Sequence, residues 1–228
     1  MLFARLATTV ALFACAGLAH AEHPFTYTIP DGWTDLSPGA PDNAFRNLHP
    51  EIVQQAQSGR FVTFAMDLRA EDSFYEVMNA VVREGALTTD DDLSKLVPEL
   101  EDVYQREFEA PVHMVEADHA DIGNVQAIRV VYDITLPKRT LRQVQYLMPG
   151  GLDWYTVVTY STVPEHYDGY RTTFEMSAKA TGGLAKAKAG FSISLIQERI
   201  PELASSIFLF TLVGFGVHES MRRKRSRR

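Results

Sequence analysis

The sequence has a single cysteine among its 228 residues, Cys15, which lies in an apolar N-terminal segment. The rest of the chain therefore cannot form an internal disulfide and cannot supply a cysteine nucleophile. Other catalytic signatures are also missing: there is no Gly-x-Ser-x-Gly elbow, no Gly-Lys-Ser/Thr phosphate loop and no His-Glu-x-x-His zinc motif. Four common classes of enzyme thus lose their main support.

Basic residues are scarce over 22–181, where 12 Lys and Arg face 26 Asp and Glu, a formal charge of −14. The charge of the whole chain is only −7 because basic residues gather near the C-terminus. An acidic domain repels phosphates, which argues against nucleic acid as a partner. A basic partner or a divalent cation is compatible with this charge, and simple solubility would explain it equally well.

The first 21 residues are typical of a secretory signal. Arg5 precedes an apolar run from Leu6 to Leu18, and small residues follow at Ala19 and Ala21. We therefore expect cleavage before Glu22 and export of the domain that follows.

The C-terminal segment predicts a membrane anchor. An uncharged run from Leu203 to Val217 would form a helix about 22 Å long, so we extend the predicted span to 200–218 to approach the roughly 30 Å hydrocarbon core. The basic tail, 219–228, favours a cytoplasmic C-terminus and attracts anionic lipid. We predict a single pass through a bacterial-type cell membrane, with the domain in the periplasm or exterior. The residues expected to anchor the chain are Leu203, Phe208, Phe210, Val217, Arg222, Arg223, Lys224 and Arg225.

Both ends allow a second interpretation. Leu12-Phe13-Ala14-Cys15 is similar to a bacterial lipoprotein cleavage box, although Phe13 is large for its position. Ile200-Pro201-Glu202 stands where a surface-protein sorting motif would lie, but Leu203 replaces the proline that should follow. A processed sorting tail predicts a mature protein that ends upstream of Leu203.

The exported part predicts an α+β domain over 22–181, in which helices pack on the faces of one antiparallel sheet. A linker over 182–199 follows. Short polar breaks between the later strands favour hairpins, and the mixed sides of the last strand favour a central position. The predicted strands are 25–29, 62–68, 112–116, 125–136, 141–148 and 154–163. The predicted helices are 51–57, 73–85, 93–104 with a break or kink at Pro98, and one that opens at Pro164 and ends near Thr181.

The domain opens with the sequence FTYTIPDGWTDLSPG, an aromatic strand followed by Pro30, Gly32 and Trp33. An exported domain with this opening, a run of hairpins and a closing aromatic helix resembles the PsbP, DcrB and Ran-release-factor superfamily over residues 24–181. Members of that superfamily are mostly noncatalytic. The resemblance therefore implies a protein that assists assembly of membrane complexes, binds small GTPases or acts as an envelope lipoprotein. No functional residue of that superfamily is carried over to this chain.

The sequence HMVEADHAD, residues 113–121, is the densest group of metal-ligand types. Glu116, Asp118, His119 and Asp121 could meet a zinc or calcium ion, while a polar hairpin end would have the same composition. His113 is expected on the opposite face of a strand from Glu116 and Asp118. A second candidate, an acid-base pair of His166 with Asp168, competes with a solvated first helical turn.

These patterns favour a membrane-tethered, noncatalytic binding or assembly module without a cofactor, whose partner is a membrane protein or envelope component near the bilayer. The enzyme alternative is a metal-dependent hydrolase that uses the residues between His113 and Asp121. It predicts a stoichiometric divalent metal, whereas the third alternative is a surface protein with a processed tail.

Overall fold

The computed structural model describes residues 23–69, 74–87, 93–108 and 110–186. The predicted signal peptide, transmembrane helix and basic tail lie outside these residues, as does most of the predicted linker. Within them, no helix is both long and apolar enough to cross a membrane. The structure therefore concerns the predicted exported domain.

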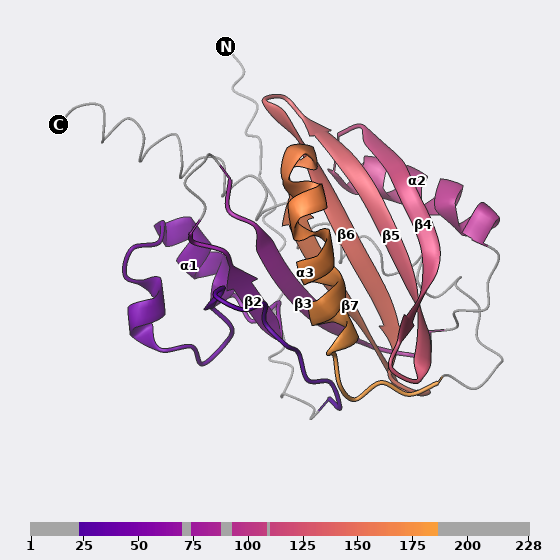
Figure 1. Cartoon of the computed structure of the whole chain (residues 1–228), viewed down its shortest axis with the longest axis horizontal. Coiled ribbons are helices and arrows are strands. Elements are labelled where there is room, and N and C mark those ends of the chain that lie inside the picture. The colour runs from indigo at the N-terminus through magenta and orange to yellow at the C-terminus, as the bar shows by residue number, and fades with distance from the viewer. Residues whose placement is uncertain (1–22, 70–73, 88–92, 109, 187–228) are drawn as a thin grey trace, which may run out of the picture.

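In the described residues, the domain has one sheet of seven strands in the order β1-β2-β3-β7-β6-β5-β4. Every neighbouring pair is antiparallel (Figure 1). The last four strands follow one another as a meander, and β3 joins this meander at β7. The strands are β1 (Thr34–Asp35), β2 (Thr63–Met66), β3 (Val77–Glu84), β4 (Val112–Ile122), β5 (Val125–Leu136), β6 (Arg139–Pro149) and β7 (Trp154–Thr162).

Helices cover both faces of the sheet, which confirms the α+β prediction. Helices α1 (Pro50–Ala56) and α2 (Leu93–Phe108) pack on one face, and α3 (Tyr167–Lys179) crosses the other (Figure 1). Short 3-10 turns, η1 (Asp42–Phe45) and η2 (Pro164–His166), precede α1 and α3. The two faces are called the α2 face and the α3 face below.

The predicted meander is confirmed. Strand β5 has the predicted bounds, and β7 lies between β3 and β6 with both of its faces buried, as its mixed pattern indicated. Strand β4 is longer than predicted and continues to Ile122. A β-bulge between Met114 and Glu116 interrupts its register with β5. The residues predicted to end a hairpin therefore belong to a strand at the edge of the sheet.

The helix predicted over 73–85 is wrong, because Val77–Glu84 forms strand β3. Val77 and Val81 face the α2 side, whereas Met78 and Ala80 face the α3 side. Since both faces of this strand are buried, it lacks the polar-apolar alternation of a half-exposed strand, and its apolar residues also match helical spacing. Strand β2, predicted to bury one face, is buried on both for the same reason.

Two smaller predictions also need correction. The opening segment 25–29 forms no full strand in the described residues and makes one isolated bridge, between Thr26 and Gly182. Of the break or kink predicted at Pro98, the break is wrong, because helix α2 continues through this residue. Pro98 lies in the second turn of α2, where its missing N–H removes one helical hydrogen bond.

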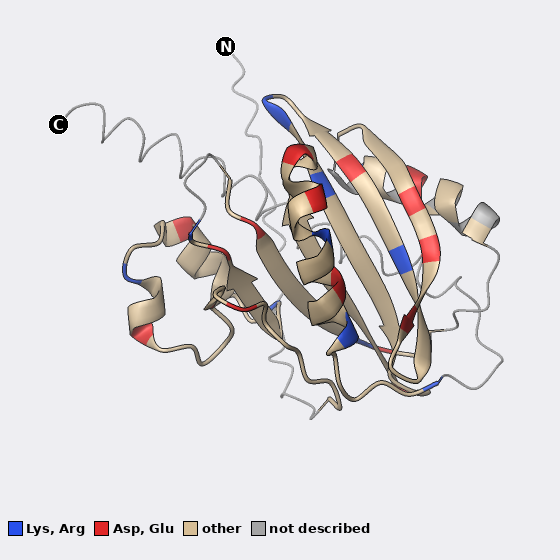
Figure 2. Ribbon diagram, viewed as in Figure 1, with Lys and Arg blue, Asp and Glu red and all other residues tan. Residues whose placement is uncertain are grey.

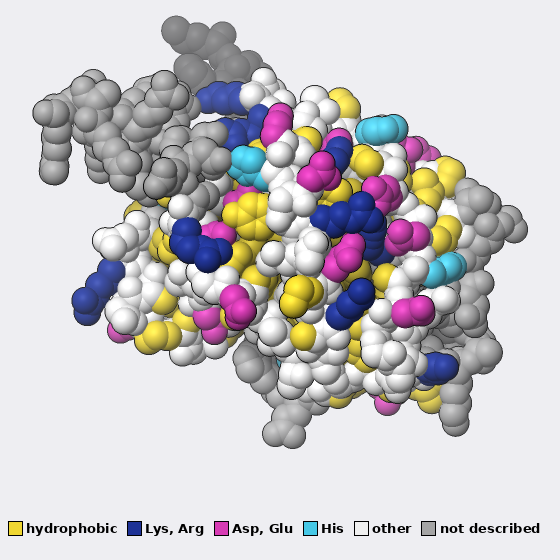
Figure 3. Space-filling view, viewed as in Figure 1, with side chains coloured by type: hydrophobic (Ala, Val, Ile, Leu, Met, Phe, Trp, Pro, Cys, Tyr) yellow, Lys and Arg dark blue, Asp and Glu magenta, His cyan; other side chains and the backbone are white. Residues whose placement is uncertain are grey.

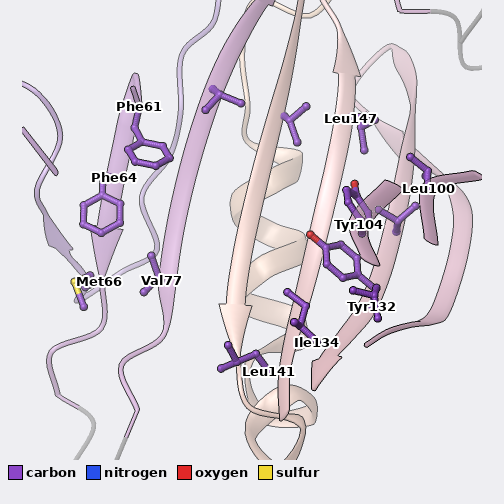
Figure 4. Packing of buried hydrophobic residues seen from close by; sticks show 14 of the residues in the cluster. Phe61, Phe64, Met66, Val77, Leu100, Tyr104, Tyr132, Ile134, Leu141 and Leu147 are labelled. Carbon is purple, nitrogen blue, oxygen red and sulfur yellow. The ribbon is translucent and has the colours of Figure 1, made fainter. Parts of the chain in front are cut away.

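A buried polar chain crosses the α2 face beneath helix α2. The Tyr104 hydroxyl donates to Gln145 Oε1 (2.6 Å), Gln145 Nε2 donates to the Tyr132 hydroxyl (2.7 Å), and that hydroxyl donates to Gln143 Oε1 (2.6 Å). Gln143 Nε2 then donates to Ser161 Oγ (3.0 Å). The rings of Tyr104 and Tyr132 stack at 4.6 Å among apolar side chains (Figure 4). Helix and sheet are thus joined by hydrogen bonds as well as by apolar packing.

The α3 face is closed by aromatic side chains. Phe174 of α3 stacks on Tyr160 of β7 at 4.8 Å, and Trp33 packs edge-on against Phe174 at 6.3 Å. Trp33 follows a turn in which its N–H donates to Pro30 O (3.1 Å) and Gly32 adopts a φ of 78°. The Pro-Asp-Gly-Trp motif therefore directs Trp33 into the core.

Candidate functional site

The residues predicted as metal ligands lie on β4, at the edge of the sheet. Glu116 and Asp118 point to the α3 face, where they meet Arg129 of β5, while the alternation of the strand places His119 and Asp121 on the α2 face. Within the described residues, no three His, Cys, Asp or Glu side chains are grouped so that they could hold a metal ion. The structure does not bring the four candidates together, and the metal site stays a prediction.

Arg129 organises the α3 side of this edge. Its side chain is only 5% exposed, and its Nη1 donates to Glu116 Oε2 at 2.9 Å while its Nε lies 3.5 Å from Asp118 Oδ1. The two carboxylates are more exposed, at 37% for Glu116 and 52% for Asp118. A buried guanidinium thus holds two acidic side chains at the surface of the domain.

The carboxyl group of Asp118 lies in an unfavourable environment for a negative charge. Burial raises the pKa of Asp118 above its ordinary value, the positive charge of Arg129 opposes this effect, and the negative charge of Glu116 adds to it. A further positive charge near Asp118 would favour its ionised form. This part of the surface is therefore suited to a cationic group.

A neighbouring ion pair extends the charged surface across the sheet. Arg142 donates from Nε and Nη2 to the two carboxylate oxygens of Asp133, at 2.8 and 2.7 Å, and its guanidinium lies 5.2 Å from the Tyr167 ring centroid. Figure 3 shows basic side chains with acidic side chains around them on this face of the domain. We use the name acidic edge for Glu116, Asp118 and Asp121 of β4, whose red bands follow that strand in Figure 2.

Helix α2 covers the backbone of β4 at its beginning. Glu101 Oε1 accepts a hydrogen bond from the Met114 N–H at 3.2 Å, and Gln105 Nε2 donates to the Val112 carbonyl at 3.3 Å. His113, whose side chain is 80% exposed, lies 3.8 Å from Glu101. These contacts end before the bulge, so α2 protects the first part of the edge strand.

A second polar cluster, which sequence reasoning missed, lies at the start of α3. The fully buried Glu76 accepts a hydrogen bond from Thr162 Oγ1 (3.1 Å) and shares one with His166 Nδ1 (2.8 Å). The structure thus pairs His166 with Glu76, while Asp168, its predicted partner, is exposed. Glu76 lies in the segment 73–85 that the sequence predicts as a helix, so no pattern links it to His166, 90 positions away.

Asp67 forms the other half of this cluster. Both of its carboxylate oxygens accept hydrogen bonds from the Arg69 guanidinium at 2.8 Å, and the Tyr170 hydroxyl donates to Oδ2 at 3.0 Å. The Arg69 hydrogen bonds lower the pKa of Asp67, although burial acts against them. Burial, followed by the negative charge of Glu76, raises the pKa of Tyr170. The cluster ties the end of β2 to α3.

We expect Asp67→Asn to lower the free energy of unfolding by an amount that depends on pH. Because the folded pKa of Asp67 is below its ordinary value of 3.8, its ionised form stabilises the fold above that pH, and this contribution is lost as the pH falls through the folded pKa. Urea unfolding between pH 2.5 and 7 should show the variant less stable than wild type at pH 7, with a gap that narrows below pH 3.8. The exposed Asp153→Asn is the control, and a gap for Asp67→Asn that stays constant with pH would contradict the assignment.

These features define an α+β domain of one antiparallel sheet, with an acidic edge strand and a buried acid cluster. Among solved structures, the chain is similar to cyanobacterial PsbP (CyanoP) from Synechocystis sp. PCC 6803, with 12% identity over 70% of this chain and 86% of that chain and a TM-score of 0.44. It is also similar to LpqN of Mycobacterium tuberculosis, a protein involved in cell envelope biogenesis, with 13% identity over 69% and 81% of the two chains and a TM-score of 0.42.

At 12 and 13% identity, both similarities concern the fold alone. No protein-family model matches the sequence. A search of curated proteins also finds no match.

Proposed function

We propose that the chain is a noncatalytic, membrane-tethered binding or assembly module that contacts a protein partner outside the cytoplasm, close to the bilayer. The observation that carries this proposal is the acidic edge, where Glu116, Asp118 and Asp121 lie together on the last strand of the sheet. Edges of sheets are surfaces on which proteins commonly receive partners. The acidity of residues 22–181 favours a partner with a basic surface.

The predicted anchor over 200–218 explains how a small contact surface would suffice. Two proteins held in one membrane meet at a high effective concentration, so a weak interface gives substantial occupancy. A basic tail at residues 219–228 would bind anionic lipid on the cytoplasmic side and leave the acidic domain on the other side for its partner.

In-cell crosslinking of the full-length tagged protein tests this function. We expect a reproducible partner after membrane extraction and mass spectrometry, absent from a control that joins residues 1–21 directly to residues 182–228. The control has the same predicted signal and anchor, so it removes partners captured by the membrane segment alone. Recovery of the protein without any partner, from membranes in which a known complex is crosslinked, would contradict the proposed function.

A further inference from the structure

Strand β4 lies at the edge of the sheet and is long for an edge strand. Among the residues that the structure describes, its hydrogen-bonded neighbour in the sheet is β5 alone. Strand β4 extends over 11 residues, whereas β1 at the opposite edge has two. An edge strand carries a row of backbone N–H and C=O groups that a further strand can pair with, and long edges are usually shortened, bulged or covered. The parts of β4 before and after the bulge differ in whether their outer backbone groups are covered.

The first part of β4 is closed to a further strand. Glu101 and Gln105 of α2 occupy the Met114 N–H and the Val112 carbonyl, which are groups that face away from β5. The bulge between Met114 and Glu116 then shifts the alternation by one residue. As a result Ala117 packs with the α2-side core, as Met114 does before the bulge, whereas Ala120 packs with the α3-side core.

The second part of β4 has the geometry to accept a strand. Glu116, Asp118 and Ala120 are paired in register with Val131, Arg129 and Ala127 of β5. Since 112 and 114 face outward before the bulge, the alternation of antiparallel pairing directs the backbone groups of Ala117, His119 and Asp121 outward after it.

Acidic side chains flank this outward backbone on both sides of the sheet. Glu116 and Asp118 stand on the α3 face and Asp121 on the α2 face, and one guanidinium, that of Arg129, contacts the first two. With the Arg171–Glu175 pair of α3, which also acts on Asp118, four carboxylates face two guanidinium groups and leave a negative local charge. A basic strand laid along this edge would place its cationic side chains beside carboxylates on either face, and an acidic strand would be repelled.

We propose that residues 116–122 of β4 receive an extended, basic segment of a protein partner, which adds to the sheet as an eighth strand. This inference rests on the proposed function and assigns it a surface and a chemical class of partner. The segment pairs with the outward backbone at Ala117, His119 and Asp121, and its Lys or Arg side chains meet the acidic edge. The capped part of β4 at 112–114 sets the point where the added strand ends.

A synthetic peptide tests the proposal on the purified full chain in nonionic detergent. The probe is a fluorescent nine-residue peptide in which pairs of lysines alternate with pairs of threonine or valine, so that lysines project from both faces of the added strand. Binding is followed by fluorescence anisotropy. We expect binding that weakens with salt and no binding of the same peptide with glutamate in place of lysine. The double variant Asp118→Asn/Asp121→Asn should bind the probe about fivefold more weakly, as expected for two exposed charge pairs. Asp102→Asn, an exposed acid on α2, is the matched control and should bind as wild type does.

Backbone methylation separates strand addition from simple charge attraction. Two versions of the probe carry N-methyl groups on alternate residues, one on the odd positions and one on the even positions. Only one set of N–H groups can face β4, so one version should lose at least tenfold in affinity while the other binds as the parent peptide does. Equal binding of both versions, or failure of the parent peptide to bind, would overturn the proposal.

The in-cell experiment distinguishes this proposal from the function on which it rests. If Asp118→Asn/Asp121→Asn loses the crosslinked partner that wild type recovers, the acidic edge is the docking surface. Equal recovery by both proteins would overturn the edge assignment and leave the binding function intact. Far-ultraviolet circular dichroism and urea unfolding of the double variant exclude loss of the fold as the cause.

Discussion

Phe174→Ala is expected to lower the free energy of unfolding by about 3–5 kcal/mol, the range for a fully buried phenylalanine. Phe174 is 1% exposed and its ring contacts those of Tyr160, Tyr170 and Trp33, at centroid distances of 4.8, 5.8 and 6.3 Å. Removing the ring leaves a space that these side chains, held by the sheet and by the turn before Trp33, cannot fill completely. For a domain of this size the melting temperature should fall by roughly 10 °C.

Met176→Ala supplies the matched control for this change. Met176 lies two residues further along α3 with 67% of its surface exposed, so its replacement should change the free energy of unfolding by less than about 0.5 kcal/mol. Urea unfolding monitored by fluorescence measures both variants. Similar losses for the two would show that α3 does not pack on the sheet through Phe174.

Tyr132→Phe is the second change with a large expected effect, a loss of about 2–4 kcal/mol. The Tyr132 hydroxyl accepts from Gln145 and donates to Gln143, so its removal deprives two buried amide groups of a partner at once. The cost of each such group in a protein interior is about 1–3 kcal/mol. The aromatic stack with Tyr104 is retained in this variant, so the loss measures the hydrogen bonds.

Tyr104→Phe tests whether Tyr132 contributes more to stability because it lies in the middle of the series of buried hydrogen bonds. The Tyr104 hydroxyl donates to Gln145 Oε1 at one end of the same chain of hydrogen bonds, and its loss should cost about half as much. Chemical denaturation of the two variants gives the comparison. A loss for Tyr132→Phe no larger than that for Tyr104→Phe would contradict the role of Tyr132 as the central link.

The sequence predicts the later half of the fold better than the earlier half, for a physical reason. Strands β4 to β7 are joined by short polar breaks, so each strand is bounded by turn residues. Strand β3 pairs with β2 and β7, and its register depends on segments that are distant in the chain. Val77, Met78, Val81 and Val82 match helical spacing, and they form a strand because the sheet on either side buries both faces of β3.

The candidate surfaces follow the same division. The acidic residues of β4 are close in sequence, so their clustering could be predicted. Their separation onto two faces follows from the continuation of β4 to Ile122, beyond its predicted end. Arg129 and Glu76 carry no local signal at all. Each acquires its role from a contact with a distant part of the chain, Arg129 with Glu116 and Glu76 with His166.

The pairing of β3 with β7 also determines the order in which this chain can fold. The meander from β4 to β7 closes through short loops and can form early. Strands β1 to β3 can join the sheet only after β7 has formed, because β3 pairs with β7, as Val77 does with Ser161. Until then β7, whose nine residues include no charge, is itself an exposed edge and a site for aggregation. The acidic β4 can remain an edge for the life of the protein, whereas β7 needs the rapid docking of β3 to protect it from aggregation.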